Sequence, residues 1–246
     1  MKVVFLGASK GMGRELARCM AERGESIFLL GRNLSELKKT ARDLEIRGAS
    51  GEVACAECDL REPDGFYSAL ENADLALKKF DVVVVSAAIL GGEQDALENS
   101  RELTAELLRV NFTNTILFCE EARRRLVERG GGKLVVFSSV AADRSRKPVI
   151  LYGATKAGIS YYLEGLDHKF YKQGLRTLLV KPGFVKTEMT ATLPSPPFAG
   201  EARAVAERVL RSIDRGDSVV YAPMIWRWIM LVIRLMPRKI MRQIDF

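Results

Sequence analysis

The chain has 246 residues, 48% of them hydrophobic, which is enough for one large α/β domain with a substantial apolar core. No run approaches the roughly 20 consecutive apolar residues of a membrane-spanning helix, and no signal-peptide layout opens the sequence, so we expect a cytoplasmic protein. The formal net charge of +7 suits an anionic partner, and because no nucleic-acid module accompanies it, we favour a phosphate-bearing substrate or a membrane surface over nucleic acid.

The cysteines and the single histidine indicate no metal site. Cys55 and Cys58 form a Cys-x-x-Cys spacing, but they have no second pair and no nearby histidine, and residues three apart in a strand face opposite sides. His168 lies on an expected helix and is expected at the surface. We therefore predict no bound metal and no Ser-His-Asp mechanism.

A strand expected over 2–6 leads into a glycine-rich turn. The turn reads Gly-x-x-x-Gly-x-Gly over 7–13, and a helix is expected over 14–23. Strand, glycine-rich turn and helix in this order indicate a dinucleotide site, because glycine lets the backbone approach the pyrophosphate at the N-terminus of the helix. The alternative is a tight turn without a ligand. The residues of the turn that we expect to contact a cofactor are Gly7, Ser9, Lys10, Gly11, Met12 and Gly13.

The end of the second expected strand, 26–30, indicates which cofactor is bound. An acidic residue at this place would bind the ribose 2′-hydroxyl, whereas an arginine can hold a 2′-phosphate. Arg32 is present, the acid is missing, and Lys10 adds a second positive charge. The pattern predicts NADP(H), with Arg32 and Asn33 as contacts. The alternative is that Arg32 is a solvated surface residue.

Helices and strands alternate along the rest of the chain up to residue 190. Helices are expected over 34–47, 63–77, most of 93–121 and 153–173, and strands over 51–58, 81–85, 134–137 and 177–180. This alternation predicts an α/β fold, a Rossmann-type doubly wound parallel sheet in a single domain, followed by a C-terminal amphipathic helical tail. Asp59 and Leu60 follow the third strand, so a carboxylate lies at the edge of the sheet where ligands gather.

Tyr152 and Lys156 are four residues apart on an expected helix, so they lie on one face, one turn apart. A lysine this close favours the phenolate and is expected to lower a phenol pKa that starts near ~10. The pair is therefore a candidate general acid–base for carbonyl and alcohol chemistry.

Together these motifs resemble those of the short-chain dehydrogenase/reductase family over about residues 1–190. Ser139 is preferred to Ser138 because it precedes Tyr152 by thirteen positions, the family's usual spacing. Two segments depart from the family pattern: 85–88 reads Val-Ser-Ala-Ala where the family has Asn-Asn-Ala-Gly, and Leu6 replaces a frequent threonine. The matching pieces, in the family's order, are Gly7–Gly13, Asp59-Leu60, Asn111, Ser139, Tyr152 with Lys156, and Pro182-Gly183 followed by Thr187.

The resemblance implies a mechanism. Tyr152 would protonate the carbonyl oxygen as hydride arrives from the nicotinamide, and Ser139 would hydrogen-bond that oxygen. Lys156 would depress the tyrosine pKa and hold the nicotinamide ribose, and Asn111 would support a water chain that resupplies the proton. Beyond the glycine turn and the Asp59-Leu60 pair, the resemblance implies cofactor contacts from Ala87, Tyr152, Lys156, Pro182, Gly183, Val185 and Thr187.

A narrower resemblance rests on Ala88-Ile89-Leu90-Gly91, the basic loop 144–147, and Tyr221-Ala222-Pro223 with the tail to Arg242. These segments are similar to the keto-reductase of the decaprenylphosphoryl-ribose to -arabinose epimerase, whose substrate is a 2-keto-pentose on a polyprenyl phosphate. The loop falls between Ser139 and Tyr152, so we expect it to border the substrate mouth, where its cations suit a phosphate. A solvated loop is the alternative.

The segment 223–246 differs in character from the domain expected over 1–222. We expect an interfacial helix on the inner face of a membrane, too short and too charged to span it; the alternative is a helix packed over the cleft or against a partner subunit. Its apolar residues are Ile225, Trp226, Trp228, Ile229, Leu231, Val232, Ile233, Leu235 and Met236, interleaved with Arg227, Arg234, Arg238, Lys239 and Arg242.

Three functions are compatible with this pattern. The first is an NADP(H)-dependent reductase of a lipid-linked or amphiphilic ketone; the second acts on a small soluble ketone, alcohol or sugar; the third is a catalytically idle NADP(H)-binding sensor. An idle relative would be expected to lose Tyr152 or Lys156, which this chain keeps. The resemblance also implies a homo-oligomer, a dimer or tetramer formed through the helices that hold Asn111 and Lys156. The proline-containing segment 193–200 is expected either to cover the substrate or to form a surface loop.

Overall fold

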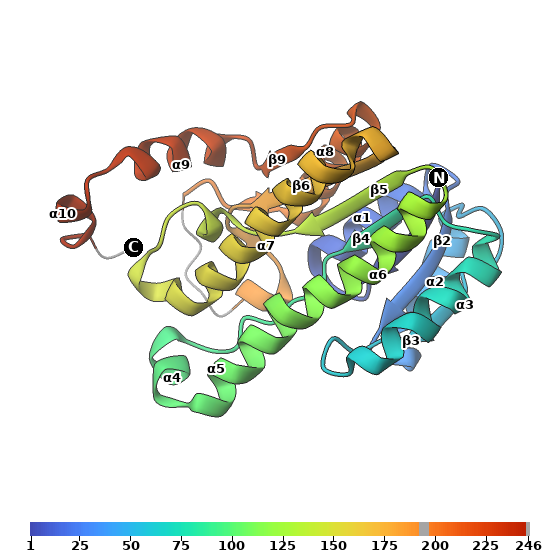
Figure 1. Cartoon of the computed structure of the whole chain (residues 1–246), viewed down its shortest axis with the longest axis horizontal. Coiled ribbons are helices and arrows are strands. Elements are labelled where there is room, and N and C mark those ends of the chain that lie inside the picture. The colour runs from blue at the N-terminus through green and yellow to red at the C-terminus, as the bar shows by residue number, and fades with distance from the viewer. Residues whose placement is uncertain (192–196, 245–246) are drawn as a thin grey trace.

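The computed structural model describes residues 1–191 and 197–244, and a parallel sheet runs through its centre (Figure 1). The sheet has seven strands in the order β3-β2-β1-β4-β5-β6-β9, and all neighbours pair in parallel. The prediction of a Rossmann-type doubly wound parallel sheet is therefore confirmed. The strands are β1 (Lys2–Leu6), β2 (Ser26–Gly31), β3 (Cys55–Glu57), β4 (Val82–Val85), β5 (Gly132–Phe137), β6 (Leu175–Pro182) and β9 (Val219–Ala222).

Helices cover both faces of this sheet, which explains why its central strands are apolar along their whole length. Successive residues of a strand point to opposite faces, so Val3 and Phe5 of β1 join one buried cluster while Val4 and Leu6 join the other. The first cluster is covered by α1 (Gly11–Ala21), α2 (Leu34–Ile46) and α8 (Ala202–Arg215). The second is covered by α3 (Phe66–Leu77), α6 (Thr115–Glu128) and α7 (Ile150–Phe170).

Shorter elements connect the strands and the helices, most of them at the carboxyl ends of the strands. The helical region predicted over 93–121 is divided into α4 (Gln94–Asn99), α5 (Arg101–Leu108), a π-helical stretch (Arg109–Asn114) and the start of α6. A separate two-stranded sheet pairs β7 (Val185–Lys186) with β8 (Gly200–Glu201). Single 3-10 turns occupy Pro63–Gly65, Val140–Ala142, Lys147–Val149, Tyr171–Gln173 and Glu188–Thr190.

The structure changes two details of the predicted sheet. The third strand is limited to Cys55–Glu57 because it pairs only with the last three residues of β2, and Gly51, within the predicted range, has a φ of +78°. The seventh strand, β9, was not predicted. Its four residues alternate in burial at the edge of the sheet and lack the continuous apolar run that marked 81–85.

The C-terminal tail forms α9 (Ile225–Leu235) and α10 (Arg238–Met241). One face of α9 is packed on the domain: Trp226, Met230 and Ile233 form a third buried cluster with Val140. This face of the helix therefore packs on the domain itself. Across the described ranges, no helix is long and apolar enough to cross a membrane.

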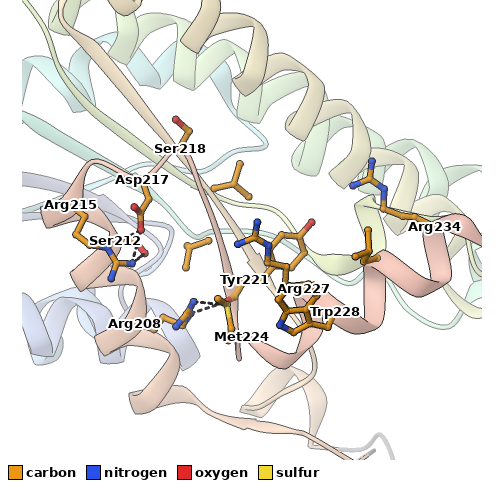
Figure 2. Close-up of a pocket in the computed structure, with 13 residues that line it drawn as sticks. Arg208, Ser212, Arg215, Asp217, Ser218, Tyr221, Met224, Arg227, Trp228 and Arg234 are labelled. Atoms are coloured by element: carbon orange, nitrogen blue, oxygen red, sulfur yellow. Dashed lines mark hydrogen bonds and ion pairs between the residues drawn. The ribbon is translucent and has the colours of Figure 1, made fainter.

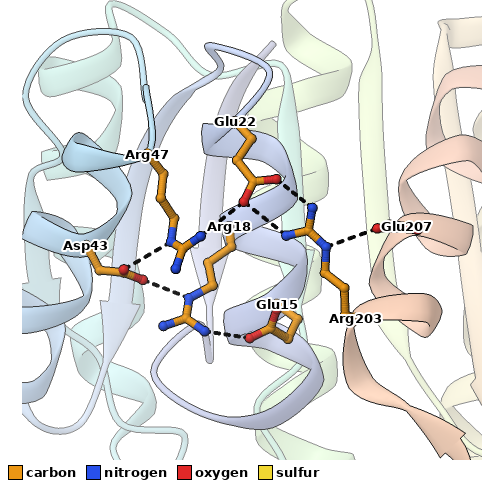
Figure 3. A network of polar contacts seen from close by, with 7 residues as sticks. All are labelled: Glu15, Arg18, Glu22, Asp43, Arg47, Arg203 and Glu207. Atoms are coloured by element: carbon orange, nitrogen blue, oxygen red, sulfur yellow. Dashed lines mark hydrogen bonds and ion pairs between the residues drawn. The ribbon is translucent and has the colours of Figure 1, made fainter.

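A network of ion pairs holds α1 between α2 and α8 (Figure 3). Glu22, the C-cap of α1, pairs with Arg47, which follows α2, and with Arg203 on α8, while Arg18 of α1 pairs with Asp43 on α2. Hydrogen bonds from Arg203 hold the pKa of the Glu22 carboxyl below its usual value. These side chains are partly exposed, so each pair contributes only ~0–1 kcal/mol. The ion pairs matter mainly for position: they hold α1 in place, and α1 is the helix that begins at the glycine turn.

Candidate active site

The glycine turn between β1 and α1 brings three backbone segments into contact. A Cβ on Gly7, whose φ is +99°, would lie 2.5 Å from the backbone nitrogen of Ala87, and one on Gly13 would lie 2.3 Å from the carbonyl oxygen of Gly7. Helix α1 starts at Gly11 without a side-chain cap and without an acidic residue in its first turn. Its first N–H groups and its positive dipole end therefore remain available to an anionic group such as a pyrophosphate.

Two adjoining hollows follow the carboxyl ends of the strands from this turn. One, of about 180 Å³, includes Arg32 and Asp59, and the other, of about 110 Å³, includes Tyr152 and Lys156. They form one continuous cleft, because five residues line both: Gly7, Lys10, Ser86, Ala88 and Met189. This is the position at which open α/β sheets bind their ligands.

Tyr152 lies in the first turn of α7 and is hydrogen-bonded to Ser139, whose hydroxyl also accepts from the backbone N–H of Ala141 at 3.1 Å. Burial raises the pKa of Tyr152 to about 12, and the hydrogen bond with Ser139 opposes this shift. The ammonium nitrogen of Lys156 is 5.7 Å from the centre of the tyrosine ring. The expectation of a lowered tyrosine pKa is thus corrected: in this structure burial of the phenolate has the largest effect and raises the pKa.

Lys156 is buried below Tyr152, and its ammonium donates to the carbonyl oxygen of Phe137 at 3.0 Å. Burial lowers the pKa of this lysine to about 8. The hydroxyl of Ser138 donates to the carbonyl oxygen of Lys156 at 3.0 Å and contacts Ser160 at 2.8 Å. The two adjacent serines therefore differ: Ser138 attaches α7 to the end of β5, whereas Ser139 contacts the tyrosine hydroxyl.

Asn111 is buried in the π-helical stretch and attaches it to the segment after β4. Its amide accepts from the backbone N–H of Ile89 at 2.9 Å and donates to the carbonyl oxygen of the same residue at 2.6 Å. π-Helical turns often occur at functional sites. Ile89 itself lines the cleft, so Asn111 shapes its wall. The water-chain role of Asn111 remains a prediction.

Comparisons with known proteins agree on one family. The model of the family described as short chain dehydrogenase matches residues 1–197. An uncharacterized oxidoreductase of Myxococcus xanthus (strain DK1622) is 34% identical over 218 residues, covering 88% of this chain and 85% of that protein. One from Streptomyces coelicolor is 32% identical over 251 residues, covering 98% and 95%. The chain belongs to the short-chain dehydrogenase family.

A solved structure of this fold has a similar arrangement of elements. An actinorhodin polyketide ketoreductase variant, crystallised with NADPH, aligns with a TM-score of 0.80 and 22% identity over 89% of this chain and 94% of that one. At this identity the likeness shows the fold alone. The chain is thus an oxidoreductase of the short-chain dehydrogenase family with the expected Rossmann-type architecture.

Most of the cofactor contacts expected of this short-chain dehydrogenase line the cleft. Asn33 does not: its side chain accepts from the backbone N–H of Glu36 at 3.0 Å and caps α2. The ammonium of Lys10 is 2.7 Å from the carboxylate of Glu188, so in this structure it bridges the mouth of the cleft. The expected residues that line the cleft are Gly7, Ser9, Lys10, Gly11, Met12, Gly13, Arg32, Asp59, Leu60, Ala87, Tyr152, Lys156 and Thr187.

The remaining expected contacts, Pro182, Gly183 and Val185, lie behind the wall of the cleft. Val185 is buried in the first core cluster, and Gly183 is in contact with Trp226 of α9, since an added Cβ would lie 2.1 Å from the indole nitrogen. These residues position the chain that leads to Thr187. The role of Trp226 was missed because nothing in the local sequence pairs a tail tryptophan with this glycine.

Ser86 was also missed, although it lines both hollows and its hydroxyl donates to the carbonyl oxygen of Gly7 at 3.0 Å. The available signal was its position directly after the buried strand β4.

Burial raises the pKa of Cys58 to about 12, which disfavours the thiolate that a metal site would need. Of the predicted cover over 193–200, residues 193–196 lie outside the described residues.

The basic loop 144–147 contacts the C-terminal tail. Arg144 donates to the carbonyl oxygen of Met236 at 2.9 Å, and a hollow of about 560 Å³ lies between the loop and α10. The adjacent Asp143 is buried against Lys181 and the hydroxyl of Tyr221, so its charge is already compensated. The basic residues that line this hollow are Arg144, Arg146, Lys147, Arg238 and Arg242.

Proposed function

We propose that this short-chain dehydrogenase interconverts a ketone and a secondary alcohol with NADP(H), using Tyr152 as the general acid and base. The observation that carries the proposal is the hydrogen bond between Tyr152 and Ser139, with Tyr152 and buried Lys156 in the wall of a cleft that continues to the glycine turn. A nicotinamide bound there would supply the hydride. The glycine turn and the uncapped start of α1 are fitted to its pyrophosphate.

The protein's own contribution is the transfer and stabilisation of one proton. With a pKa raised to about 12, Tyr152 carries its proton at neutral pH and can donate it from Oη to a carbonyl oxygen that becomes an alkoxide. Ser139 donates a hydrogen bond to the same oxygen. The ammonium of Lys156, 5.7 Å from the tyrosine ring, stabilises the tyrosinate that remains. In alcohol oxidation the same groups act in reverse order.

The preference for the phosphorylated cofactor is proposed from charge at the adenosine side of the cleft. Arg32 and Lys10, whose ammonium pairs with Glu188, both line this hollow, and the residues directly after β2 are Arg32 and Asn33 with no acidic residue. The carboxylate of Asp59 accepts from the backbone N–H of Arg61 at 2.9 Å. Arginine matches the geometry of a phosphate, so its position favours a 2′-phosphate over a free hydroxyl.

The substrate that we propose is an amphiphilic ketone that carries an anionic group, of the lipid-linked keto-sugar type. Two features support this: the basic hollow between 144–147 and α10, and the tail cluster that packs on Val140, next to Ser139. We further propose that 1–222 carries cofactor binding and catalysis, while 223–246 makes contact with a membrane surface. This would make the protein peripheral to the membrane.

We also propose a homo-oligomer, a dimer or tetramer. Leu117 on α6 and Tyr161 on α7 are large exposed side chains on helices of the sheet's outer layer, and Tyr161 is 82% exposed. A subunit contact through these helices would cover them. Light scattering coupled to size exclusion measures the subunit number directly, and a monomer at all concentrations would overturn this part of the proposal.

Turnover of a ketone panel by the purified chain, with NADPH and NADH compared, tests the proposed function. The panel contains small soluble ketones and keto-sugars carrying a phosphate or a prenyl phosphate. Tyr152→Phe is expected to lower kcat by about 10²–10⁴-fold while NADPH binding, followed by fluorescence, is unchanged. Tyr161→Phe on the same helix is the matched control. Unchanged turnover in Tyr152→Phe would refute the mechanism, and a preference for NADH or for small neutral ketones would refute the assigned cofactor or substrate.

A further inference from the structure

A second hollow lies between α8, β9 and α9 (Figure 2). It is at the opposite end of the sheet from β3. Its volume is about 640 Å³, which is within the range of sites for small ligands. None of the residues that line it also lines the two hollows of the cleft. It is therefore separate from the candidate active site.

The side chains of this hollow carry a strong positive charge. Four arginines line it, Arg208 and Arg215 from α8 and Arg227 and Arg234 from α9. Its single lining carboxylate, Asp217, is 2.7 Å from Arg215. Over residues 1–191 and 197–244, none of the other three arginines forms an ion pair. Arg208, Arg227 and Arg234 thus line the hollow without an ion pair among the described residues, and its one lining carboxylate, Asp217, is paired with Arg215.

Contacts within the hollow hold one of these arginines in place. Nε of Arg208 donates to the carbonyl oxygen of Tyr221 at 2.7 Å, and its Nη2 is 2.8 Å from the sulfur of Met224. Burial and the neighbouring positive charges, Arg215 among them, lower the pKa of Arg208. A bound anion would relieve this repulsion between like charges.

Helix α9 places an exposed apolar face beside the arginines. Trp228, Val232 and Leu235 follow one another at helical spacing, and all three are exposed, as is Leu231 in the wall of the hollow. Arg227 and Arg234 are two turns apart, at the border between this face and the buried face of the helix. Aromatic and aliphatic residues bordered by arginine are typical of a helix that lies in a membrane interface.

We propose that the hollow binds the headgroup phosphate of an anionic phospholipid, while Trp228, Leu231, Val232 and Leu235 enter the outer part of the bilayer. The inference rests on the proposed function in one respect, since a reductase of an amphiphilic ketone would meet its substrate at a lipid surface. Charge complementarity selects the anionic group, and the planar guanidinium fork matches a phosphate. The adjacent apolar face selects a lipid over a soluble phosphate, which would leave that face in water.

Flotation of the full chain with vesicles tests this site. Vesicles of phosphatidylcholine alone are compared with vesicles in which one lipid in four is phosphatidylglycerol. The site variant is Arg227→Gln with Arg234→Gln, and the matched control is Lys38→Gln with Arg42→Gln on α2, which removes the same charge at the opposite edge of the sheet. Binding of the wild-type chain should require phosphatidylglycerol. The affinity of the site variant for these vesicles should be about 25-fold lower, a factor of about five for each arginine. The control should bind as the wild type does.

Three patterns of vesicle binding would overturn the proposal: equal binding to both vesicles, equal binding by the site variant, or an equal loss in the control. So would displacement by glycerol phosphate at millimolar concentration, or a dimer in solution that the site variant dissociates, because the occupant would then be a soluble phosphate or a second copy. Turnover of a water-soluble ketone and the thermal midpoint are recorded for every variant. If no ketone is reduced but vesicle binding shows the expected pattern, the proposed reductase activity fails and the lipid site stands.

Discussion

The indole of Trp226 is packed against Gly183, so closely that a Cβ on this glycine would lie 2.1 Å from the indole nitrogen. The same nitrogen donates to the carbonyl oxygen of Phe198 at 3.3 Å. Gly183 follows β6 and leads to Thr187, which lines the cleft beside Tyr152. The C-terminal tail therefore supports the wall of the candidate active site from outside.

Replacing Trp226 by alanine is expected to lower the free energy of unfolding by about 3–5 kcal/mol, because a large buried side chain is lost and a cavity remains. NADPH binding should weaken as well, since the segment to Thr187 loses its support. Urea denaturation and a fluorescence titration with NADPH measure the two effects. Trp228→Ala is the control: its side chain is 56% exposed, and its effect on stability should stay within about 0.5 kcal/mol. Equal stability of the two variants would contradict the assigned packing.

The sequence predicts the candidate site well where the chemistry depends on local spacing. The glycine motif lies within a single turn, and Tyr152 and Lys156 lie on a single helix. The geometry of each therefore follows from its residue spacing alone. The contact between Trp226 and Gly183 joins segments that are distant along the chain. No local pattern predicts this contact. The sequence therefore left two alternatives open for the tail, a packed helix and a membrane-bound helix.

The same limit applies to the tail and to the tyrosine. The apolar side chains of α9 lie on all sides of the helix, so their spacing does not tell which side the domain covers. The structure buries Met230 and Ile233 and leaves Val232 exposed. The direction of the Tyr152 pKa was predicted from one neighbouring charge, whereas burial, which depends on the whole fold, has the larger effect. Long-range packing is the common reason for both differences.

The glycine turn gives a second prediction. A Cβ on Gly13 would lie 2.3 Å from the carbonyl oxygen of Gly7 and 2.4 Å from the hydroxyl oxygen of Ser86, so Gly13→Ala must displace the backbone of the turn. We expect a loss of about 1–3 kcal/mol in stability and at least a tenfold weaker NADPH affinity in calorimetry. Gly65→Ala, where nothing lies within 4 Å of the added Cβ, should leave both unchanged. NADPH affinity that survives in Gly13→Ala would show that the turn is not part of the cofactor site.

The adjacent serines after β5 are expected to respond differently to the same change. Ser139→Ala removes the hydroxyl that contacts Tyr152 and accepts from the N–H of Ala141, so kcat should fall by about 10²–10³-fold and stability by about 1 kcal/mol. Ser138→Ala removes a hydrogen bond to the backbone of α7 and should cost about 1–2 kcal/mol of stability while kcat changes only a few-fold. Steady-state kinetics and thermal melts of both variants give the comparison. The reverse pattern would assign the substrate contact to Ser138.

Lys156 gives a prediction in which stability and activity change in opposite directions. Burial lowers the pKa of this lysine from 10.5 to about 8, so the unfolded chain holds the proton more tightly than the folded one. The charge therefore costs stability below pH 8, and the stability of the wild-type chain should rise as the pH increases from about 8 to 10.5. Lys156→Met removes the buried charge and should be more stable by about 1–3 kcal/mol at pH 7, with the difference narrowing above pH 8.

Turnover of Lys156→Met should nevertheless fall at least 100-fold, because the tyrosinate loses the cation that stabilises it. For the wild-type chain, kcat for ketone reduction should decline as the pH rises through about 8, where the lysine loses its proton. Thermal melts and kcat measured across the same pH series report both effects. A variant that is less stable at pH 7 would show that the hydrogen bond from Lys156 to Phe137 outweighs the cost of burial. A variant with unchanged kcat would remove Lys156 from the mechanism.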